Sequence, residues 1–376
     1  MEFRDTEKFR GTKDESLLSA RLVYDPETKD PGRYADENRR FQGIPGIETT
    51  TGGRLFFCFY SGTDGEGSGN FVLLYAGESE EGPFRQILAV DAPTEKTRTF
   101  DPCLWIDDRE RLWLFWAQSY TWFDGRVGVW AAVCPDPDAE TVRFSSPRRI
   151  ADGIMMNKPI VTRDGSWLLC CALWEGFPSE YNDLPEERFP NVVRSADGGE
   201  SFWKIGHANW PDRLIDEPMA AELSDGRVWM LIRGKKGIGQ SFSSDGGFTW
   251  SPGEDSGLGG PGSRFCLRRL KSGRLLLVNH YNYTGRNNLT AMLSEDDGRS
   301  WKGFFTLDGR DDVSYPDAAE TADGRILIVY DRKRYAEKEI LLAAVTEADI
   351  LEGRPVSPLC RLKTVLNRAA GGNPNP

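Results

Sequence analysis

Six apolar runs of strand length, each introduced by a tight polar turn, recur along the chain. Five of the turns contain glycine, and the sixth lacks it but keeps the run. The runs are GGRLFFCFY from Gly52, DRERLWLFWAQ from Asp108, DGSWLLCCALW from Asp164, DGRVWMLIR from Asp225, SGRLLLVNHY from Ser272 and DGRILIVYDR from Asp323. A short apolar run behind a glycine turn is typical of a buried β-strand, so the pattern predicts six similar β units.

A second phrase, Ser-x-Asp-x-Gly-x-(Ser/Thr)-(Trp/Phe), gives the period of these units. It reads SADGGESF from Ser195, SSDGGFTW from Ser243 and SEDDGRSW from Ser294, at spacings of 48 and 51 residues. Degenerate copies are expected near Ser79, Cys134 and Thr346. A period of about 50 residues is typical of propellers or solenoids, and no polar capping units are evident. The sequence therefore predicts an all-β fold, a six-bladed β-propeller, with no helix of consequence.

The six units divide the chain into three parts. Residues 39–366 form the predicted propeller, and residues 1–38 an N-terminal extension whose segment 21–25 could close the ring by joining the last blade. Residues 367–376 are expected to be a disordered tail. The longest irregular insertion, residues 174–190, is aromatic and acidic, which suits a loop over a binding site.

Composition narrows the classes of partner. A formal net charge of −11 argues against nucleic acid and anionic membranes, although local arginines could still bind an anionic small molecule. The first 15 residues lack the apolar core of a signal peptide and no 18-residue apolar run follows, so we expect a cytoplasmic protein. Seven cysteines without a CxxC pair and only two histidines predict free thiols, no metal site and no cofactor.

Polar side chains recur where each innermost strand should enter the central channel, about 8–11 residues before the glycine turn. These positions hold Gln42, Asp101, Asn157 with Lys158, Asp216 with Glu217, Arg264, and Tyr315 with Asp317. Any one of them could be a solvated channel residue. Six of six at one height around one axis favour a binding or active site.

The far ends of the apolar runs return to the same face. Arg233 ends an otherwise apolar strand, where a charge needs a partner or an anionic ligand. Arg286 should begin the next strand of the fifth unit and reach the same rim. His280 lies in NHYNYTGR, and its polar neighbours are compatible with a binding role as well as a structural one.

The Ser-x-Asp-x-Gly-x-Thr-Trp phrase resembles the Asp box, or BNR repeat, of the sialidase superfamily, over nearly the whole chain. EPMAAELSDGRVWMLIR, TGRNNLTAMLSEDDGRSW and VSYPDAAETADGRILIVYDR are similar to three segments of that family. The resemblance implies that Tyr315 is a nucleophile paired with Glu217 and that Arg233 and Arg286 bind a substrate carboxylate. It implies an acidic oligosaccharide or glycoside as the substrate.

The chain departs from the family pattern at two positions. Either Gln42 or Gly43 stands where the family carries its first carboxylate-binding arginine, and Arg39 and Arg40 are out of phase with that position. The family's acid/base aspartate has no clear counterpart, so Asp101 or the Asp64 and Glu66 loop is expected to supply the acid.

Three functions are compatible with this pattern. The first is an exo-acting glycoside hydrolase for a terminal acidic sugar, with Arg264, Gln42, Lys158 and Asp317 as further substrate-binding candidates. The second is a uronate lyase of the rhamnosyl-glucuronate type, in which His280 and Tyr315 act as base and acid. The third is a non-catalytic glycan-binding propeller, for which a paired Glu217 and Tyr315 would have no purpose.

Overall fold

Six antiparallel sheets follow one another around a common axis in the computed structural model, which describes residues 14–29, 31–174 and 187–372. The first sheet runs β2 (Phe41–Thr49), β3 (Leu55–Gly62), β4 (Phe71–Gly77) and β5 (Arg85–Asp91), with β1 (Arg21–Tyr24) outside β5. The second comprises β6 (Thr97–Ile106), β7 (Leu112–Tyr120), β8 (Val127–Cys134) and β9 (Arg148–Asp152). The third comprises β10 (Ile160–Val161), β11 (Trp167–Ala172), β12 (Pro190–Ser195) and β13 (Trp203–His207).

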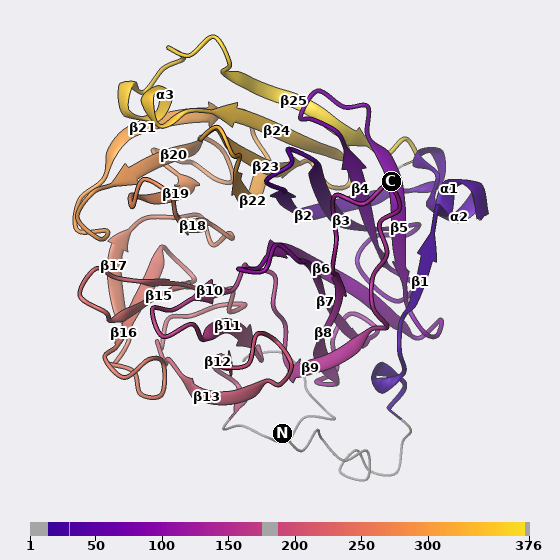
Figure 1. The fold of residues 1–376 in the computed structure, drawn as a ribbon, viewed down its shortest axis with the longest axis horizontal. Helices are drawn as coiled ribbons and strands as arrows, with labels where there is room; N and C mark the ends of the chain where they lie inside the picture. The colour runs from indigo at the N-terminus through magenta and orange to yellow at the C-terminus, as the bar shows by residue number, and fades with distance from the viewer. Residues whose placement is uncertain (1–13, 30, 175–186, 373–376) are drawn as a thin grey trace.

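The remaining three sheets complete the ring (Figure 1). The fourth runs β14 (Met219–Glu222), β15 (Val228–Arg233), β16 (Ile238–Ser243) and β17 (Glu254–Leu258). The fifth runs β18 (Cys266–Arg269), β19 (Leu275–His280), β20 (Leu289–Ser294) and β21 (Lys302–Asp308). The sixth runs β22 (Val313–Glu320), β23 (Ile326–Arg332), β24 (Glu339–Val345) and β25 (Arg361–Arg368), and it packs beside the first. The predicted six-bladed propeller is confirmed.

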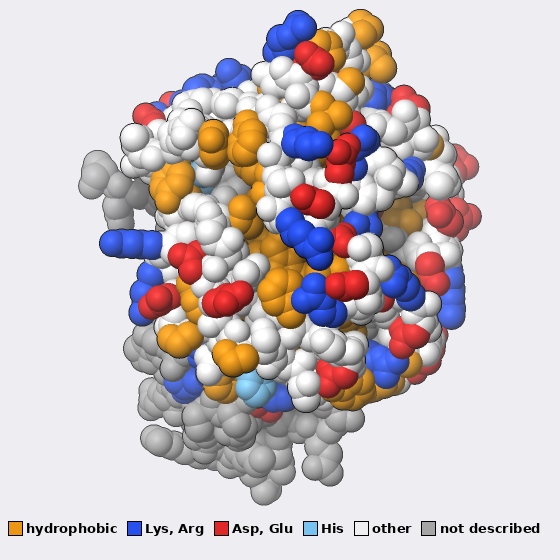
Figure 2. Space-filling model, turned by 90° about the vertical axis from the view of Figure 1, so that its left-hand side faces the viewer, with side chains coloured by type: hydrophobic (Ala, Val, Ile, Leu, Met, Phe, Trp, Pro, Cys, Tyr) orange, Lys and Arg blue, Asp and Glu red, His pale blue; other side chains and the backbone are white. Residues whose placement is uncertain are grey.

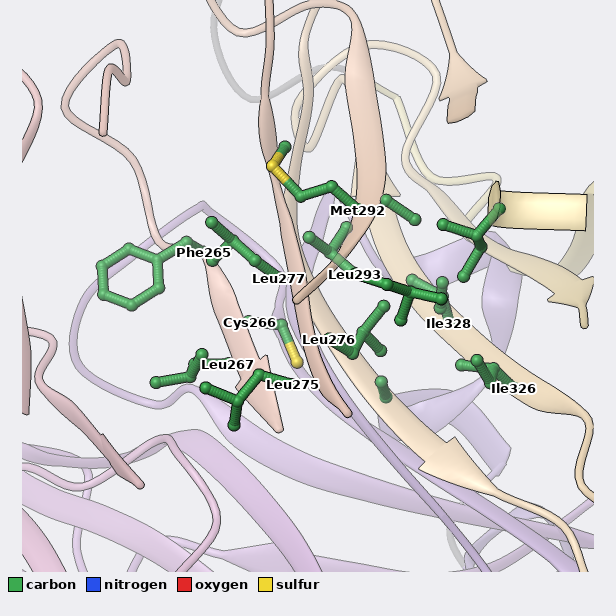
Figure 3. Close-up of a cluster of buried hydrophobic side chains, with 14 of the residues drawn as sticks. Phe265, Cys266, Leu267, Leu275, Leu276, Leu277, Met292, Leu293, Ile326 and Ile328 are labelled. Atoms are coloured by element: carbon green, nitrogen blue, oxygen red, sulfur yellow. The ribbon is translucent and has the colours of Figure 1, made fainter. Parts of the chain in front are cut away.

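The apolar runs form the second strand of each blade, and they supply most of the core. Each sheet is covered on both faces by its neighbours, so the strands β3, β7, β11, β15 and β19 are buried along their whole length. Figure 3 shows one such interface, where Leu276 and Leu293 of the fifth blade lie near Ile328 of the sixth. Figure 2 shows acidic and basic side chains interspersed on one side of the molecule, with no large area of a single sign.

Several sequence predictions for the ends of the chain need correction. The segment around Leu22 does not join the last blade: β1 pairs with β5 of the first blade, because β25 already supplies the fourth strand of the last one. The predicted tail begins too early, since Asn367 and Arg368 belong to β25 and the amide of Ala370 donates to Asp36. Residues 373–376 lie outside the described residues.

Helices are few and short in the part of the chain that the structure describes. The helical segments are η2 (Glu15–Leu17), α1 (Pro26–Lys29), α2 (Pro31–Tyr34), η3 (Asp36–Asn38) and α3 (Glu347–Glu352). The predicted degenerate turn near Thr346 is instead α3, whose first turn is closed by reciprocal bonds between Thr346 and Asp349. Among the described residues, no helix has the length and hydropathy needed to cross a membrane.

Candidate active site

The inner strands of three blades share a bulge that turns one side chain out of the regular alternation. The register of β2, β6 and β22 breaks at this point, and each gap holds a non-glycine residue with positive φ followed by proline. These residues are Ile44 (φ 58°), Asp101 (φ 48°) and Tyr315 (φ 57°). Bulges re-aim side chains and are frequent near active sites, so the fold itself singles out Asp101 and Tyr315.

Tyr315 lies at the centre of a buried hydrogen-bonded cluster. Its hydroxyl donates to Oε1 of Glu217 at 2.5 Å and accepts from Nη1 of Arg233 at 3.0 Å. Arg233 also contacts the same carboxylate oxygen at 2.8 Å. All three side chains are almost fully buried, and they come from the inner strand of blade 6, the segment before β14 and the end of β15. The structure therefore brings together the Tyr315, Glu217 and Arg233 that the sequence singled out.

Two further arginines flank the ring of Tyr315. The guanidinium carbon of Arg286 lies 5.5 Å from the ring centroid and that of Arg334 lies 4.0 Å from it. Arg233 and Arg286 both donate through Nη2 to the carbonyl of Gly262, at 2.6 and 3.4 Å, so their guanidiniums lie within reach of one carboxylate. The sequence predicts that Arg286 begins the third strand of blade 5. In the structure it lies in the loop before that strand, β20.

The surroundings of Tyr315 act on its phenol in opposite directions. Its pKa is raised on balance to about 12, chiefly by burial and also by the neighbouring Glu217 carboxylate. The charges of Arg233, Arg334 and Arg286 lower the pKa. The phenol is therefore protonated near neutral pH, and its reaction as a nucleophile requires a base that takes its proton, a role for which Glu217 is in contact.

Asp101 has the pKa of a group able to exchange a proton near neutral pH. Its pKa is raised to about 7, chiefly by burial and also by the Glu66 and Glu217 carboxylates, while the charges of Arg98 and Arg334 oppose the shift. A carboxyl group with such a pKa is suited to act as a general acid. Of the alternative acids, Asp64 is largely exposed and lies 3.6 Å from Arg40, whereas Glu66 lies 3.8 Å from Arg334.

A cavity of about 580 Å³ opens above this cluster. Its walls include Tyr315, Arg233, Arg286, Arg334, Glu66 and Tyr335. The sequence analysis missed Arg334 as a site residue because the repeat pattern ends with β23, two residues earlier. The only signal available was the basic ending DRKR of that apolar run. Among the described residues, no group of His, Cys, Asp and Glu could hold a metal ion.

Three predicted substrate-binding residues instead belong to a charged network inside the channel. Nζ of Lys158 lies 3.1 Å from Glu48 and from Asp317 and donates to the carbonyls of Ile47 and Leu104. Arg264 is fully buried and donates to Asn157 at 2.7 Å. These contacts join the inner strands of several blades, and Lys158, Arg264 and Asp317 do not line the cavity above Tyr315. Their protein partners account for their charges.

Gln42 and His280 also differ from expectation. Gln42 is fully buried and donates to the carbonyl of Lys338, and Arg39 donates to it, so it holds the N-terminal segment in place. Nδ1 of His280 lies 2.8 Å from the carbonyl of Asn287. Burial lowers the pKa of His280 to about 4, so its imidazole is neutral near pH 7. Neither residue lines the cavity.

Comparison with known proteins is consistent with this geometry. Residues 53–328 match the model of the BNR repeat-like domain. The chain belongs to this family. No curated protein matches the chain significantly. A Hadza microbial sialidase, Hz136, is similar in structure with a TM-score of 0.66 at 18% identity, over 85% of this chain and 69% of that one.

Two other solved structures have the same fold as this BNR repeat-like domain. The intramolecular trans-sialidase from Ruminococcus gnavus gives a TM-score of 0.65 at 12% identity, covering 90% of this chain and 99% of that one. A protein of unknown function from Dyadobacter fermentans gives 0.61 at 15% identity, covering 85% and 95%. The resemblance to the sialidase superfamily is therefore confirmed for the fold.

The Asp boxes of this BNR repeat-like domain lie in the turns between outer strands. In the first, Asp197 accepts bonds from the amides of Glu200 and Ser201 and from two serine hydroxyls. Asp245 and Asp296 make the equivalent contacts. The pKa of each carboxyl falls to about 2, chiefly because a hydroxyl of its own turn donates to it. These bonds stay within the turns, so the boxes stabilise the blades.

Proposed function

We propose that this protein is a retaining exo-glycoside hydrolase that removes a terminal acidic sugar, with Tyr315 as the nucleophile and Glu217 as its base. One observation carries the proposal: the buried hydroxyl of Tyr315 donates to Glu217 at 2.5 Å beneath a cavity lined with arginines. A phenol that is hydrogen-bonded to a carboxylate can lose its proton to that carboxylate as it attacks, without an exposed phenolate forming first.

The proposed reaction has two steps. Oη of Tyr315 forms a bond with the anomeric carbon while its proton passes to Glu217, and the bond from that carbon to the leaving oxygen breaks. Asp101 gives its proton to the leaving oxygen, which its pKa of about 7 permits. Water then attacks the anomeric carbon and gives a proton to Asp101, the bond to Tyr315 breaks, and Glu217 returns its proton to the phenol.

An acidic sugar is favoured by the arginines around the nucleophile. Guanidinium groups bind carboxylates through two parallel hydrogen bonds. Such contacts suit arginines that are partly buried, as they are around this cavity. The named sialidases and trans-sialidases among the similar structures support the same class of substrate. The lyase hypothesis has less support, because the Nδ1 atom of its expected base, His280, lies 2.8 Å from the carbonyl of Asn287 and burial lowers the pKa of this histidine to about 4.

A substrate panel with two tyrosine variants tests the proposal. The panel holds 4-methylumbelliferyl glycosides of N-acetylneuraminic, glucuronic and galacturonic acids, a neutral galactoside, and rhamnosyl-glucuronate oligosaccharides monitored for unsaturated uronate. Tyr315→Phe should lower turnover of the preferred acidic glycoside by about 10²-fold or more, the scale of losing a proton-transfer or covalent role.

The matched control is Tyr330→Phe. Tyr330 is a fully buried tyrosine of blade 6 whose hydroxyl donates to Asp308 at 3.1 Å, away from the cavity. The Tyr330→Phe variant should therefore keep the turnover of the wild-type protein. Full activity in Tyr315→Phe would contradict the mechanism, and unsaturated product with loss of activity in His280→Ala would establish the lyase instead. Binding of glycans without any turnover would favour the glycan-binding propeller.

A further inference from the structure

Arg334 reaches the cavity from a hairpin that lies outside the repeated sequence phrases. It follows β23 in the hairpin that leads to β24, and its side chain is only 12% exposed. Its guanidinium lies over the ring of Tyr315, 4.0 Å from the centroid, on the wall of the cavity. A guanidinium held beside the proposed nucleophile can interact electrostatically with a ligand bound in the cavity.

Gly43 makes room for this side chain. A Cβ atom at Gly43 would lie 2.7 Å from Cδ of Arg334 and 2.8 Å from its Cγ and Nε. Any larger residue at position 43 in β2 would therefore displace Arg334. Arg334 of blade 6 therefore occupies the space that a side chain at position 43 of blade 1 would fill.

Arg334 is fixed at its base and weakly engaged at its tip. Its Nε donates to Oδ2 of Asp331 at 2.8 Å, and this fully buried carboxylate also accepts from the amide of Ile44 and the hydroxyl of Ser314. By contrast, Nη2 lies 3.4 Å from Ser314, and Nη1 lies 3.8 Å from Glu66, which is longer than a direct hydrogen bond. The outer edge of the guanidinium can therefore receive a ligand.

The three arginines of the cavity differ in what already engages them. Arg233 contacts Glu217 at 2.8 Å and the Tyr315 hydroxyl at 3.0 Å through Nη1 and donates to the carbonyl of Gly262 at 2.6 Å through Nη2, so both of its terminal nitrogens already have close protein partners. Arg286 donates to the carbonyl of Gly262 at 3.4 Å, and its guanidinium carbon lies 5.5 Å from the centroid of the Tyr315 ring on the wall of the cavity. Arg286 and Arg334 thus have the guanidinium edges that a carboxylate needs.

We propose that Arg334 and Arg286 together bind the carboxylate of the substrate, while Arg233 positions Tyr315 and Glu217. The assignment rests on the proposed function and makes it more specific, because the carboxylate-binding pair comes from blades 5 and 6. Position 43 of blade 1 contributes only space. Asp331 is a positioning residue in this arrangement, since it holds Arg334 without facing the ligand.

Calorimetric titration with free N-acetylneuraminate, glucuronate and galactose tests the assignment without requiring turnover. Arg334→Met should weaken binding of the preferred acidic sugar by roughly 10- to 100-fold, the scale of losing charge-assisted hydrogen bonds. The control is Arg332→Met. Arg332 lies two residues earlier at the end of β23, pairs with Glu339 at 3.0 Å and does not line the cavity, so binding should be unchanged.

Two variants at position 43 test the shared space. Gly43→Ala should weaken acidic-sugar binding by displacing Arg334, with a circular dichroism spectrum like that of the wild type. The double variant Gly43→Arg with Arg334→Ala should bind more tightly than Arg334→Ala alone, because the new stem starts where that of Arg334 now lies.

The outcomes separate this assignment from the proposed function. Unchanged affinity in a folded Arg334→Met protein would overturn the role of Arg334 and leave the hydrolase proposal intact. Wild-type protein that binds neither acidic sugar would overturn both. Wild-type binding with loss in Arg334→Met, together with full activity in Tyr315→Phe, would support the carboxylate site and reject the nucleophile.

Discussion

At the level of single residues, burial changes the protonation of polar side chains in the site. Asp101 illustrates this, because burial raises its pKa to about 7. The general-acid role requires the protonated form, so kcat/KM should fall as the pH rises through about 7. In Asp101→Asn, turnover should drop about 10²-fold and the loss above pH 7 should disappear. An unchanged alkaline limb in that variant would assign the titration to another group.

The same shift makes a prediction about stability. The folded protein binds the Asp101 proton more tightly than the unfolded chain, so the contribution of this group to stability is greatest below about pH 4 and is lost as the pH rises to about 7. Each pKa unit corresponds to about 1.4 kcal/mol. Asp101→Asn should therefore raise the free energy of unfolding more at pH 8 than at pH 5, as measured by urea denaturation.

The sequence identified part of this site and missed part of it. Tyr315, Glu217 and Asp101 were found because each occupies an inner-strand entry, a position that the repeat places on one face of every blade. Arg334 was not found because it lies beyond the repeating unit, and only the three-dimensional structure shows that it fills the space left by Gly43. Lys158 and Arg264 satisfied the same entry rule, yet their partners lie inside the channel.

At the scale of the element, the Asp-box turns depend on glycine for two separate reasons. Gly199 has φ 88°, and a Cβ there would lie 2.5 Å from Trp167 and 2.6 Å from Trp113. Gly246 has φ 75°, but a Cβ there meets nothing within 4 Å. The two positions share the backbone strain and differ in the packing.

Gly199→Ala should therefore destabilise the protein more than Gly246→Ala. Strain at positive φ amounts to about 1 kcal/mol or more, and overpacking adds about 1–3 kcal/mol. We expect a loss of roughly 2–4 kcal/mol for Gly199→Ala and about 1 kcal/mol for Gly246→Ala, measured by chemical denaturation. Equal losses would show that the indole rings move aside and that only the backbone conformation matters.

The strands were predictable and some of their connections were not. Each apolar run became a second strand because its continuous apolar sequence, its length and the polar turn before it all favour a buried strand. Near Thr346 the local capping bonds with Asp349 favour a helical turn, and the sequence likeness to an Asp box was too weak to reveal this. Similarly, β1 pairs with β5, with Leu22 opposite Val90, and such backbone pairing leaves little trace in the sequence.

At the scale of the whole molecule, the propeller brings residues far apart in the chain to one axis. Glu217 and Tyr315 are 98 residues apart, and their hydrogen bond joins blade 4 to blade 6 across the site. Asp331 connects blade 6 to blade 1 through the amide of Ile44. Closure of the ring is therefore what assembles the cluster, and this explains why a repeat fold can hold a site that no single repeat contains.

The proposed mechanism requires that Tyr315 form a bond with the anomeric carbon of an acidic sugar. Peptide mass spectrometry after incubation with a fluorinated analogue of the preferred acidic glycoside tests it most directly, because fluorine slows breakdown of a glycosyl-enzyme. We predict a sugar adduct on Tyr315, formed with loss of fluoride, and none in Tyr315→Phe. An adduct on another residue, or turnover of the parent glycoside without any adduct on Tyr315, would contradict the account.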